Sequence, residues 1–385
     1  MKKIMYVFTV TILATIILSS SISYANNNLN DFITEKEAIE RASDFISNSK
    51  FWSKRFDNIS VIGNNITKIY DSSGAFIAYY VDVQFDNDNG YVLVGSKPSI
   101  PVLQVGQKSF IEKENMSHLA KNDKVMMEKR YIFAGLQNHI VEYNYKDGTK
   151  DFIDIYTGEK ILDIKSLRPL MLSSDKEDIL SKDSFDYSPF SDPPAGELDY
   201  PIPILDQNDL GPDLRGTGCG PTTGAAILWY LAENDSEYSS IINHYKNNPI
   251  ALAKVLFYDM QSYIGTTVPY YRNGINARLS ALELPEATFK TTSLGYSNLW
   301  NSIKTGIDVY DSPVALFVGT INLPYPIPEY PEPELSTLHW VAINAWWTDD
   351  QQEDYIGYMT WGALYEDNFR AVYEWRNNLT TVYIR

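Results

Sequence analysis

Cysteine is almost absent from this sequence of 385 residues, which contains a single one, Cys219. A chain with one cysteine forms no intrachain disulfide, so its core has to hold the fold. Histidine is also scarce, with four residues, and no His or Cys pairs show metal-ligand spacing. No phosphate-binding Gly-Lys-Thr loop appears. The sequence therefore predicts neither a bound metal nor a cofactor.

Long hydrophobic runs are absent after the first 25 residues. Residues 1–25 are typical of a signal peptide, with two lysines at the start, an apolar run over 5–18 and small residues at 23 and 25. The run is short for a stable membrane span, and no second one follows. We therefore expect a secreted, extracellular protein without a membrane partner.

Basic residues are outnumbered by acidic ones, 32 to 49, and the formal net charge is −17. Such a field repels nucleic acid and promotes solubility, so a nucleic-acid partner is not expected. The charge says little about the substrate. Hydrophobic residues make up 44% of the chain and aromatic residues 14%, which is enough to bury a sizeable core and excludes a disordered chain.

Three regions follow the signal peptide. Residues 26–165 predict a small α+β domain with an antiparallel sheet. A capping box at Thr34 and Glu37 starts its helix. Its strands are expected near 78–85, 91–94, 101–105, 140–145 and 152–156, with turns at 88–90 and 146–148. Residues 166–199 are polar or proline-rich and lack periodicity, which indicates an exposed linker that a protease can reach.

Residues 200–385 predict a second α+β domain, because helices come first and strands later. Helices are expected from Cys219 onward and near 250–263, 276–282 and 296–303. Strands are expected at 314–318, 339–346, 355–361 and 369–374.

The segment around the cysteine is the most informative one and reads GTGCGPTTGAAILWYL over 216–231. Pro221 suits the first turn of a helix, and Ala225 and Leu228 begin a buried stripe. Cys219 therefore lies at a helix N-terminus, where unpaired amides and the helix dipole lower a thiol pKa. A structural cysteine would lie on the apolar face, a turn or more later. This position predicts a nucleophile.

A thiolate nucleophile needs an acid that protonates the leaving amine. His339 begins the apolar strand HWVAINAW, and a strand packed against the helix is a rigid platform for a Cys–His pair. His118 and His139 lie in the N-terminal region, and His244 lies in a polar helical stretch. We therefore expect His339 to be the base for Cys219.

Together the two segments resemble papain-like cysteine peptidases, and more closely the bacteriocin-leader-processing peptidases and their secreted relatives. That family has an upstream glutamine, then Gly-Cys-Gly-Pro opening a helix, then a histidine heading a strand. Gln207 stands in PILDQND before GCGP at 218–221. The resemblance covers residues 200 to about 365. It implies a peptide or protein substrate, a thioester acyl-enzyme, Cys219 as nucleophile, His339 as base, and Gln207 as a donor to the oxyanion.

A looser resemblance concerns the N-terminal region, where AYYV, GYVLVGS and PVL follow one another between 78 and 103. This pattern is similar to the prodomain of streptopain-type peptidases, which blocks the cleft until it is cut away. It implies that residues 26–165 are a prodomain and an inhibitory partner of the catalytic domain. We expect a cut in 166–199 to free that domain.

The sequence departs from the family where an Asp or Asn should orient the imidazole. The stretch YMTWG at 358–362 puts Thr360 there in the streptopain register and Met359 in the papain register. A Thr hydroxyl can accept the imidazole N–H, but it stabilises imidazolium less than a carboxylate does. Asp349 and Asp350 are nearby in sequence, but we expect them at a turn between strands.

Three functions stay open. The first is an active secreted cysteine peptidase made as a zymogen, and the second is a peptidase-fold protein used for binding or inhibition. The third is another Cys–His enzyme, such as a transglutaminase or a cell-wall amidase.

A proline-rich segment at 323–334 forms either a rim over the cleft or a surface connection. Four tryptophans, Trp340, Trp346, Trp347 and Trp361, belong either to the cleft wall or to the core.

Overall fold

The computed structural model describes residues 32–111, 125–135, 139–156, 158, 160–161, 164, 194–263, 265–293, 295–319, 339–375 and 378–385. These residues form a mixed α+β fold with a large, mostly antiparallel sheet, which confirms the α+β class. The predicted signal peptide, the proline-rich segment 323–334, His118 and most of the predicted linker lie outside the described residues.

The first helix begins at the predicted capping box. The Thr34 hydroxyl accepts the backbone N–H of Glu37 at 3.2 Å, and the Thr34 backbone N–H donates to the Glu37 carboxylate at 2.7 Å. Helix α2 then covers Glu35–Asn48, and α3 covers Lys50–Ser53. Ala38, Ala42 and Ile46 form the buried stripe of α2, which packs on strands β1 to β4.

Among the described residues of the N-terminal region, seven strands form the sheet: β1 Ile59–Tyr70, β2 Phe76–Phe85, β3 Asp88–Gly95, β4 Val102–Gly106, β5 Met126–Phe133, β6 His139–Tyr145 and β7 Lys150–Asp154. The β2–β3 turn lies at 86–87, two residues before the predicted turn, and Asp86 takes a left-handed φ of 46° there. Strands β1 and β5 were not predicted. A register shift between Ile62 and Ile66 interrupts the alternation of β1.

The C-terminal region carries most of the helices: η3 Gln207–Leu210, η4 Arg215–Thr217, α4 Cys219–Asn234, α5 Ser240–His244, α6 Pro249–Asp259, α7 Val268–Ala281, α8 Tyr296–Tyr310 and α9 Phe369–Trp375. Its strands are β8 Ala195–Glu197, β9 Phe289–Ser293, β10 Val314–Gly319, β11 His339–Thr348, β12 Asp354–Thr360, β13 Ala363–Asn368 and β14 Asn378–Ile384. The predicted strand at 369–374 is wrong, because this segment is helix α9. The Asn368 side chain accepts the backbone N–H of Ala371 at 2.9 Å and so caps its start.

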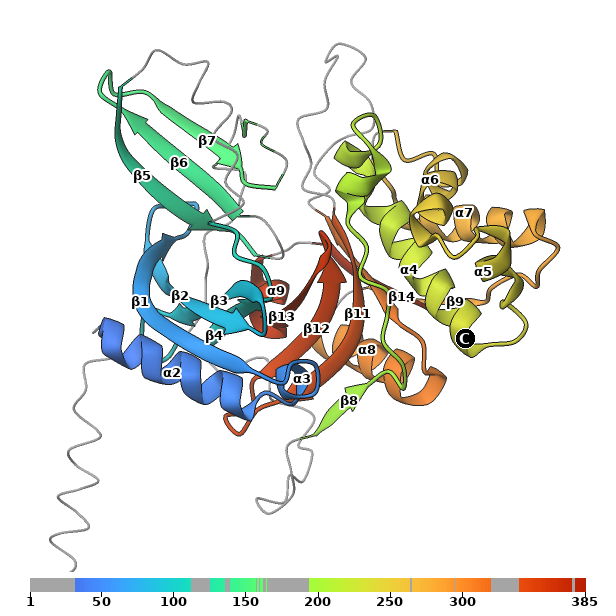
Figure 1. Cartoon of the computed structure of the whole chain (residues 1–385), viewed down its shortest axis with the longest axis horizontal. Coiled ribbons are helices and arrows are strands. Elements are labelled where there is room, and N and C mark those ends of the chain that lie inside the picture. The colour runs from blue at the N-terminus through green and yellow to red at the C-terminus, as the bar shows by residue number, and fades with distance from the viewer. Residues whose placement is uncertain are drawn as a thin grey trace, which may run out of the picture.

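One sheet connects both regions in the order β7-β6-β5-β1-β2-β3-β4-β13-β12-β11-β10-β14-β9, with β8 added along β11. Strands β4 and β13 join the two regions predicted as separate domains. Figure 1 shows α4 to α7 grouped beside the C-terminal strands, away from β5 to β7 at the other end of the molecule. Helix α4 packs on β10 and β11, and its buried residues bring the cysteine segment against the sheet.

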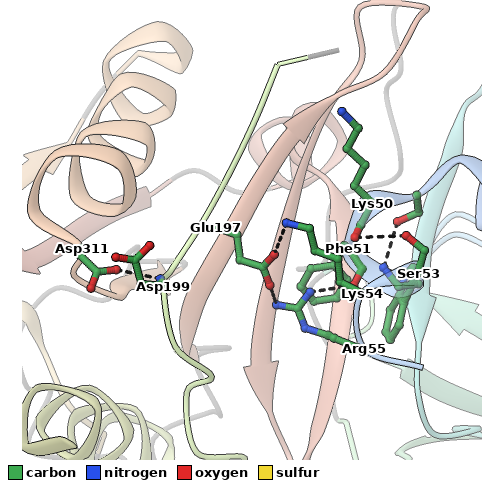
Figure 2. Close-up of polar contacts among 10 residues, drawn as sticks. Lys50, Phe51, Ser53, Lys54, Arg55, Glu197, Asp199 and Asp311 are labelled. Carbon is green, nitrogen blue, oxygen red and sulfur yellow. Dashed lines mark hydrogen bonds and ion pairs between the residues drawn. The ribbon is translucent and has the colours of Figure 1, made fainter. Parts of the chain in front are cut away.

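A second link between the regions runs through β8, at the end of the predicted linker. Residues 195–197 pair with β11, so this part of the predicted linker is strand. In Figure 2, Lys54 and Arg55, which follow α3, converge on Glu197 of β8. The Lys54 ammonium is 3.0 Å from the Glu197 carboxylate, and the Arg55 guanidinium forms an ion pair with the same group. The two regions therefore meet along a seam that includes the β4–β13 pair and the ion pairs of Glu197.

In the part of the chain that the structure describes, no helix combines the length and the apolar character that a bilayer span requires.

Candidate active site

Cys219 is the first residue of α4, directly after Gly218. The thiol is buried, with 7% of the residue exposed. Its sulfur lies within hydrogen-bonding reach of the backbone N–H groups of Trp340, Gly220 and Cys219 itself. Because Trp340 directly follows His339, the structure brings the end of the cysteine helix to the start of the histidine strand.

Tight packing through Thr266 holds this helix end and the strand together. A Cβ added at Gly220 would lie 2.5 Å from the Thr266 hydroxyl oxygen, so only glycine fits there without a shift. The backbone carbonyl of Thr266 accepts the indole N–H of Trp340 at 2.7 Å. The Trp340 ring in turn stacks on Tyr271 at a centroid distance of 4.2 Å. The rigid core behind the site therefore fixes the position of Cys219.

His339 meets the hydroxyl of Thr360 on the neighbouring strand β12. The distance between His339 Nε2 and Thr360 Oγ1 is 3.0 Å. Met359 faces elsewhere, where its sulfur accepts the backbone N–H of Leu205 at 3.4 Å. Of the two registers left open by the sequence, the structure therefore has the one in which Thr360 is the imidazole partner. If Nε2 donates to this hydroxyl, Nδ1 carries the lone pair that a base requires.

Two aromatic rings stack in succession on the imidazole. Trp361 lies on His339 with a centroid distance of 5.7 Å and an interplanar angle of 9°. Tyr156 of the N-terminal region lies on Trp361 at 5.4 Å and 11°. Tyr156 is not evident as a site residue from the sequence, because nothing in its local sequence indicates a partner more than 200 residues away. The N-terminal region thus reaches the histidine through one intervening ring.

Trp361 has an unusual backbone conformation. Together with Gly362 it forms the two-residue turn between β12 and β13, with φ values of 49° and 66°. Such turns favour Asn, Asp or Gly, and a bulky residue at positive φ is an outlier. The ring stack and the main-chain contacts hold it in place. The backbone carbonyl of Gly362 accepts the Lys108 ammonium at 2.6 Å, and its N–H donates to the carbonyl of Leu205 at 3.0 Å.

Gln207 lies beside the residue that precedes the cysteine. It is buried at the start of η3, and a Cβ added at Gly218 would be 3.6 Å from the Cβ of Gln207. Its side-chain nitrogen donates to the backbone carbonyl of Arg215 at 2.6 Å. A carboxamide nitrogen carries two hydrogens, and this bond uses one of them. The structure therefore brings all three predicted site residues into one neighbourhood.

The ionisation of the thiol differs from the sequence prediction. Burial raises the pKa of Cys219 from 9.0 to about 11, although the three backbone N–H groups act in the opposite direction. The prediction of a lowered pKa is therefore wrong for the full-length chain. The helix-end amides act as expected, but the cost of burying a thiolate exceeds their effect. In this form the thiol is protonated at neutral pH.

The other histidines and the acidic pair occupy other positions in the fold. The His139 ring lies 5.4 Å from the Tyr156 ring, so Tyr156 and Trp361 separate it from His339. His139 is a core residue, with its Nε2 2.8 Å from the side-chain oxygen of Gln104, and His244 is exposed at the end of α5. Asp349 and Asp350 follow the last residue of β11. A strand of ten residues spans roughly 30 Å, so these carboxylates lie at the opposite end from His339.

All four tryptophans are buried in the core, and Trp361 also stacks on the histidine. The indole N–H of Trp346 donates to Asp308 at 2.9 Å, and that of Trp347 donates to Glu366. A hollow of about 380 Å³ opens between α2, the start of β4 and the β11–β12 turn. Its lining includes Trp347 and neither Cys219 nor His339. Over the described ranges, no group of three or more His, Cys, Asp or Glu residues could hold a metal ion.

No family model, no curated protein and no solved structure matches this chain.

Proposed function

We propose that this protein is a secreted cysteine peptidase with a papain-like catalytic part at residues 200–385, made as a zymogen. The observation that carries the proposal is the meeting of Cys219 with the start of β11. The sulfur contacts the N–H of Trp340, and the adjacent His339 is oriented from its far side by Thr360. A nucleophile, a base and a group that orients the base are the parts that such chemistry requires.

The reaction uses these groups in two steps. His339 Nδ1 takes the proton from Cys219 Sγ, and the thiolate attacks the scissile carbonyl carbon. The backbone N–H of Cys219 and the amide of Gln207 stabilise the resulting oxyanion. The imidazolium then gives its proton to the leaving amine, the C–N bond breaks and a thioester remains. In the second step His339 deprotonates water, which attacks the thioester and returns the thiol with a carboxylic acid product.

The state of the thiol supports a latent precursor. Cys219 is buried and its pKa is raised to about 11, so few chains carry a thiolate near neutral pH. Residues 26–165 serve in this proposal as the inhibitory partner, and a cut within 166–193 begins activation. Access of water to Cys219 would remove the cost of burial and leave the amides free to lower the pKa.

A second candidate is a protein with this fold that binds peptides or inhibits peptidases without cleaving them. The specific observation in its favour is the Thr360 hydroxyl, which replaces a carboxylate or carboxamide. A hydroxyl stabilises an imidazolium less well, and a site that starts from a protonated thiol needs that stabilisation.

A thiol-directed peptidyl inhibitor separates the two candidates. The full-length chain and the chain cut within 166–193 are incubated with the inhibitor at pH 8.5, where the N-terminal region is expected to be released after the cut, and adduct formation at Cys219 is followed by intact mass. The peptidase predicts fast labelling after the cut, loss of labelling in Cys219→Ala, and slow labelling in His339→Ala. An unreactive thiol in the cut chain would favour the binding protein. Parallel assays of peptide release, wall-fragment release and amine incorporation distinguish a peptidase from an amidase or a transglutaminase.

A further inference from the structure

Two neighbouring carboxyl groups are buried where the N-terminal and C-terminal regions meet. Glu366 and Asp367 lie on β13 with 1% and 0% of their surface exposed. Both residues pair with β4 across the seam, Glu366 with Val105 and Asp367 with Gln104. Buried carboxyl groups without a cationic contact are rare, because burial strongly disfavours their charged form.

Glu366 is held mainly by the N-terminal region. The indole N–H of Trp52 donates to its carboxylate at 2.7 Å, and the Ser49 hydroxyl lies 3.3 Å from both of its oxygens. From its own region, the indole N–H of Trp347 donates to the other oxygen. The Arg55 guanidinium acts on Glu366 through its charge, but its ion pair is formed with Glu197.

Asp367 has a similar arrangement. The side-chain nitrogen of Gln104 on β4 donates to one carboxylate oxygen at 2.7 Å, and Tyr358 also hydrogen-bonds to Asp367. The other oxygen is buried without a hydrogen-bond partner among the described residues. Gln104 is itself bonded to Tyr91 and His139. The charged and titratable groups around the two carboxyls are Arg55, Tyr91, His139, Tyr355, Tyr358 and Tyr365.

Burial raises the pKa of Glu366 and of Asp367 to about 8 in each case, while the hydrogen bonds from their neighbours act in the opposite direction. Both groups are therefore mostly protonated at neutral pH in the assembled fold. A neutral carboxyl avoids the cost of an uncompensated charge inside the seam.

The apolar packing across the same seam is as tight as in a core. Trp52 is fully buried and Phe51 is 3% exposed. A Cβ added at Gly357 on β12 would lie 2.2 Å from the Phe51 ring, so α3 is pressed directly onto the C-terminal sheet. One hydrophobic cluster contains these residues together with Cys219. The N-terminal region thus contributes to a shared core and is not a detached cover.

We propose that the N-terminal region stays bound along β13 after the chain is cut within 166–193, and that it leaves only when Glu366 and Asp367 ionise. This inference rests on the division of the chain given in the proposed function, but it does not require peptidase activity. Cleavage and release are then two separate steps, and the second one is controlled by pH.

The direction of the pH effect follows from the protons bound in each state. In separated pieces β13 is an edge strand, so both carboxyls reach water and titrate near their ordinary pKa values of 4.5 and 3.8. Between these values and about 8, the assembled form holds protons that the separated pieces release. The dissociation constant of the pieces therefore rises with pH, by at most about tenfold per pH unit for each carboxyl. It levels off above the pKa values of the assembled form.

The test uses the full chain with Cys219→Ala, so that the protein cannot process itself. A recognition sequence for a site-specific protease is inserted within 173–178, and the chain is cut completely. Sedimentation of a dilution series then gives the dissociation constant of the two pieces between pH 5.5 and 9. We expect one complex at pH 6 and a dissociation constant at least a hundredfold higher at pH 8.5.

Matched variants identify the groups responsible. Asp367→Asn keeps the oxygen that Gln104 binds and removes the titration of this carboxyl group. The rise of the dissociation constant with pH should therefore become less steep, by up to tenfold per pH unit. Glu366→Gln provides a second, independent variant. Asp350→Asn, at an exposed position of the β11–β12 turn, should leave the pH dependence unchanged.

Separate pieces at pH 6 would overturn the retention of the N-terminal region. A dissociation constant that does not change up to pH 9, or a pH dependence as steep in both carboxyl variants as in the parent chain, would overturn the role of these groups. Because the readout is association in a chain without its thiol, none of these results bears on peptidase activity, and a failed peptidase assay would not affect them.

Discussion

The buried thiol of Cys219 provides the sharpest prediction. In the full-length chain, burial holds its pKa at about 11 instead of 9.0. A difference of two pKa units corresponds to about 3 kcal/mol. At pH 7.5 the thiolate fraction is then about a hundredfold lower than for an ordinary exposed thiol. We expect the folded chain to react with iodoacetamide at least a hundredfold more slowly than the same chain unfolded in guanidinium.

The sequence makes this assay unusually clean, because Cys219 is the one cysteine present. Every alkylated molecule is modified at the same site, and intact mass gives the rate directly. The rate should increase about tenfold per pH unit between pH 7 and 10. Circular dichroism at each pH checks that the chain is still folded.

His339→Ala is the informative control for the thiol. With a protonated thiol and a neutral imidazole, removal of the ring changes the labelling rate by less than about threefold, since no ion pair is lost. A thiolate–imidazolium pair would instead make the variant at least tenfold slower than the parent chain. Labelling of the folded parent faster than the unfolded chain at pH 7.5, with a plateau below pH 9, would refute the reasoning from burial.

Two further substitutions test the site and the seam. Thr360→Val removes the hydroxyl 3.0 Å from His339 Nε2 and leaves the N–H of the half-buried imidazole without this acceptor, which costs about 1–3 kcal/mol. Under the proposed function, the peptidase activity of the cut chain should fall about 5- to 150-fold, with much less loss in Thr360→Asn. Equal losses in both variants would contradict the orienting role. Gly357→Ala puts a Cβ 2.2 Å from the Phe51 ring, and overpacking of this kind costs about 1–3 kcal/mol. Denaturant unfolding should show that loss, whereas Gly216→Ala, which meets nothing within 4 Å, should unfold like the parent; an unchanged midpoint for both would count against tight packing at the seam.

Local signals in the sequence predicted the elements that carry the site. The capping box at Thr34 and Glu37 gives the start of α2 correctly, because both partners lie within one turn. The glycines and Pro221 around Cys219 likewise give the start of α4. His339 begins β11 as predicted. In each case the residues that determine the element are neighbours along the chain.

Features that depend on distant partners could not be predicted in this way. The segment 369–374 alternates enough to suggest a strand, but Asn368 caps it as a helix. From the sequence alone, the carboxyl groups of Glu366 and Asp367 indicate an exposed strand end. Their hydrogen-bond donors in the buried position come from Trp52 and Gln104, more than 260 residues earlier. The thiol pKa of Cys219 differs from the prediction for the same reason. The helix end is visible in the sequence, and the burial is not.

The pairing of β4 with β13 also has a consequence for biogenesis. Gln104 and its partner Asp367 are separated by 263 positions, so β4 is synthesised long before the strand that completes it. Until then its unpaired backbone edge can add a strand from another molecule. Contacts between such distant residues also slow folding. A factor that shields this edge during synthesis should therefore increase the yield of the native protein.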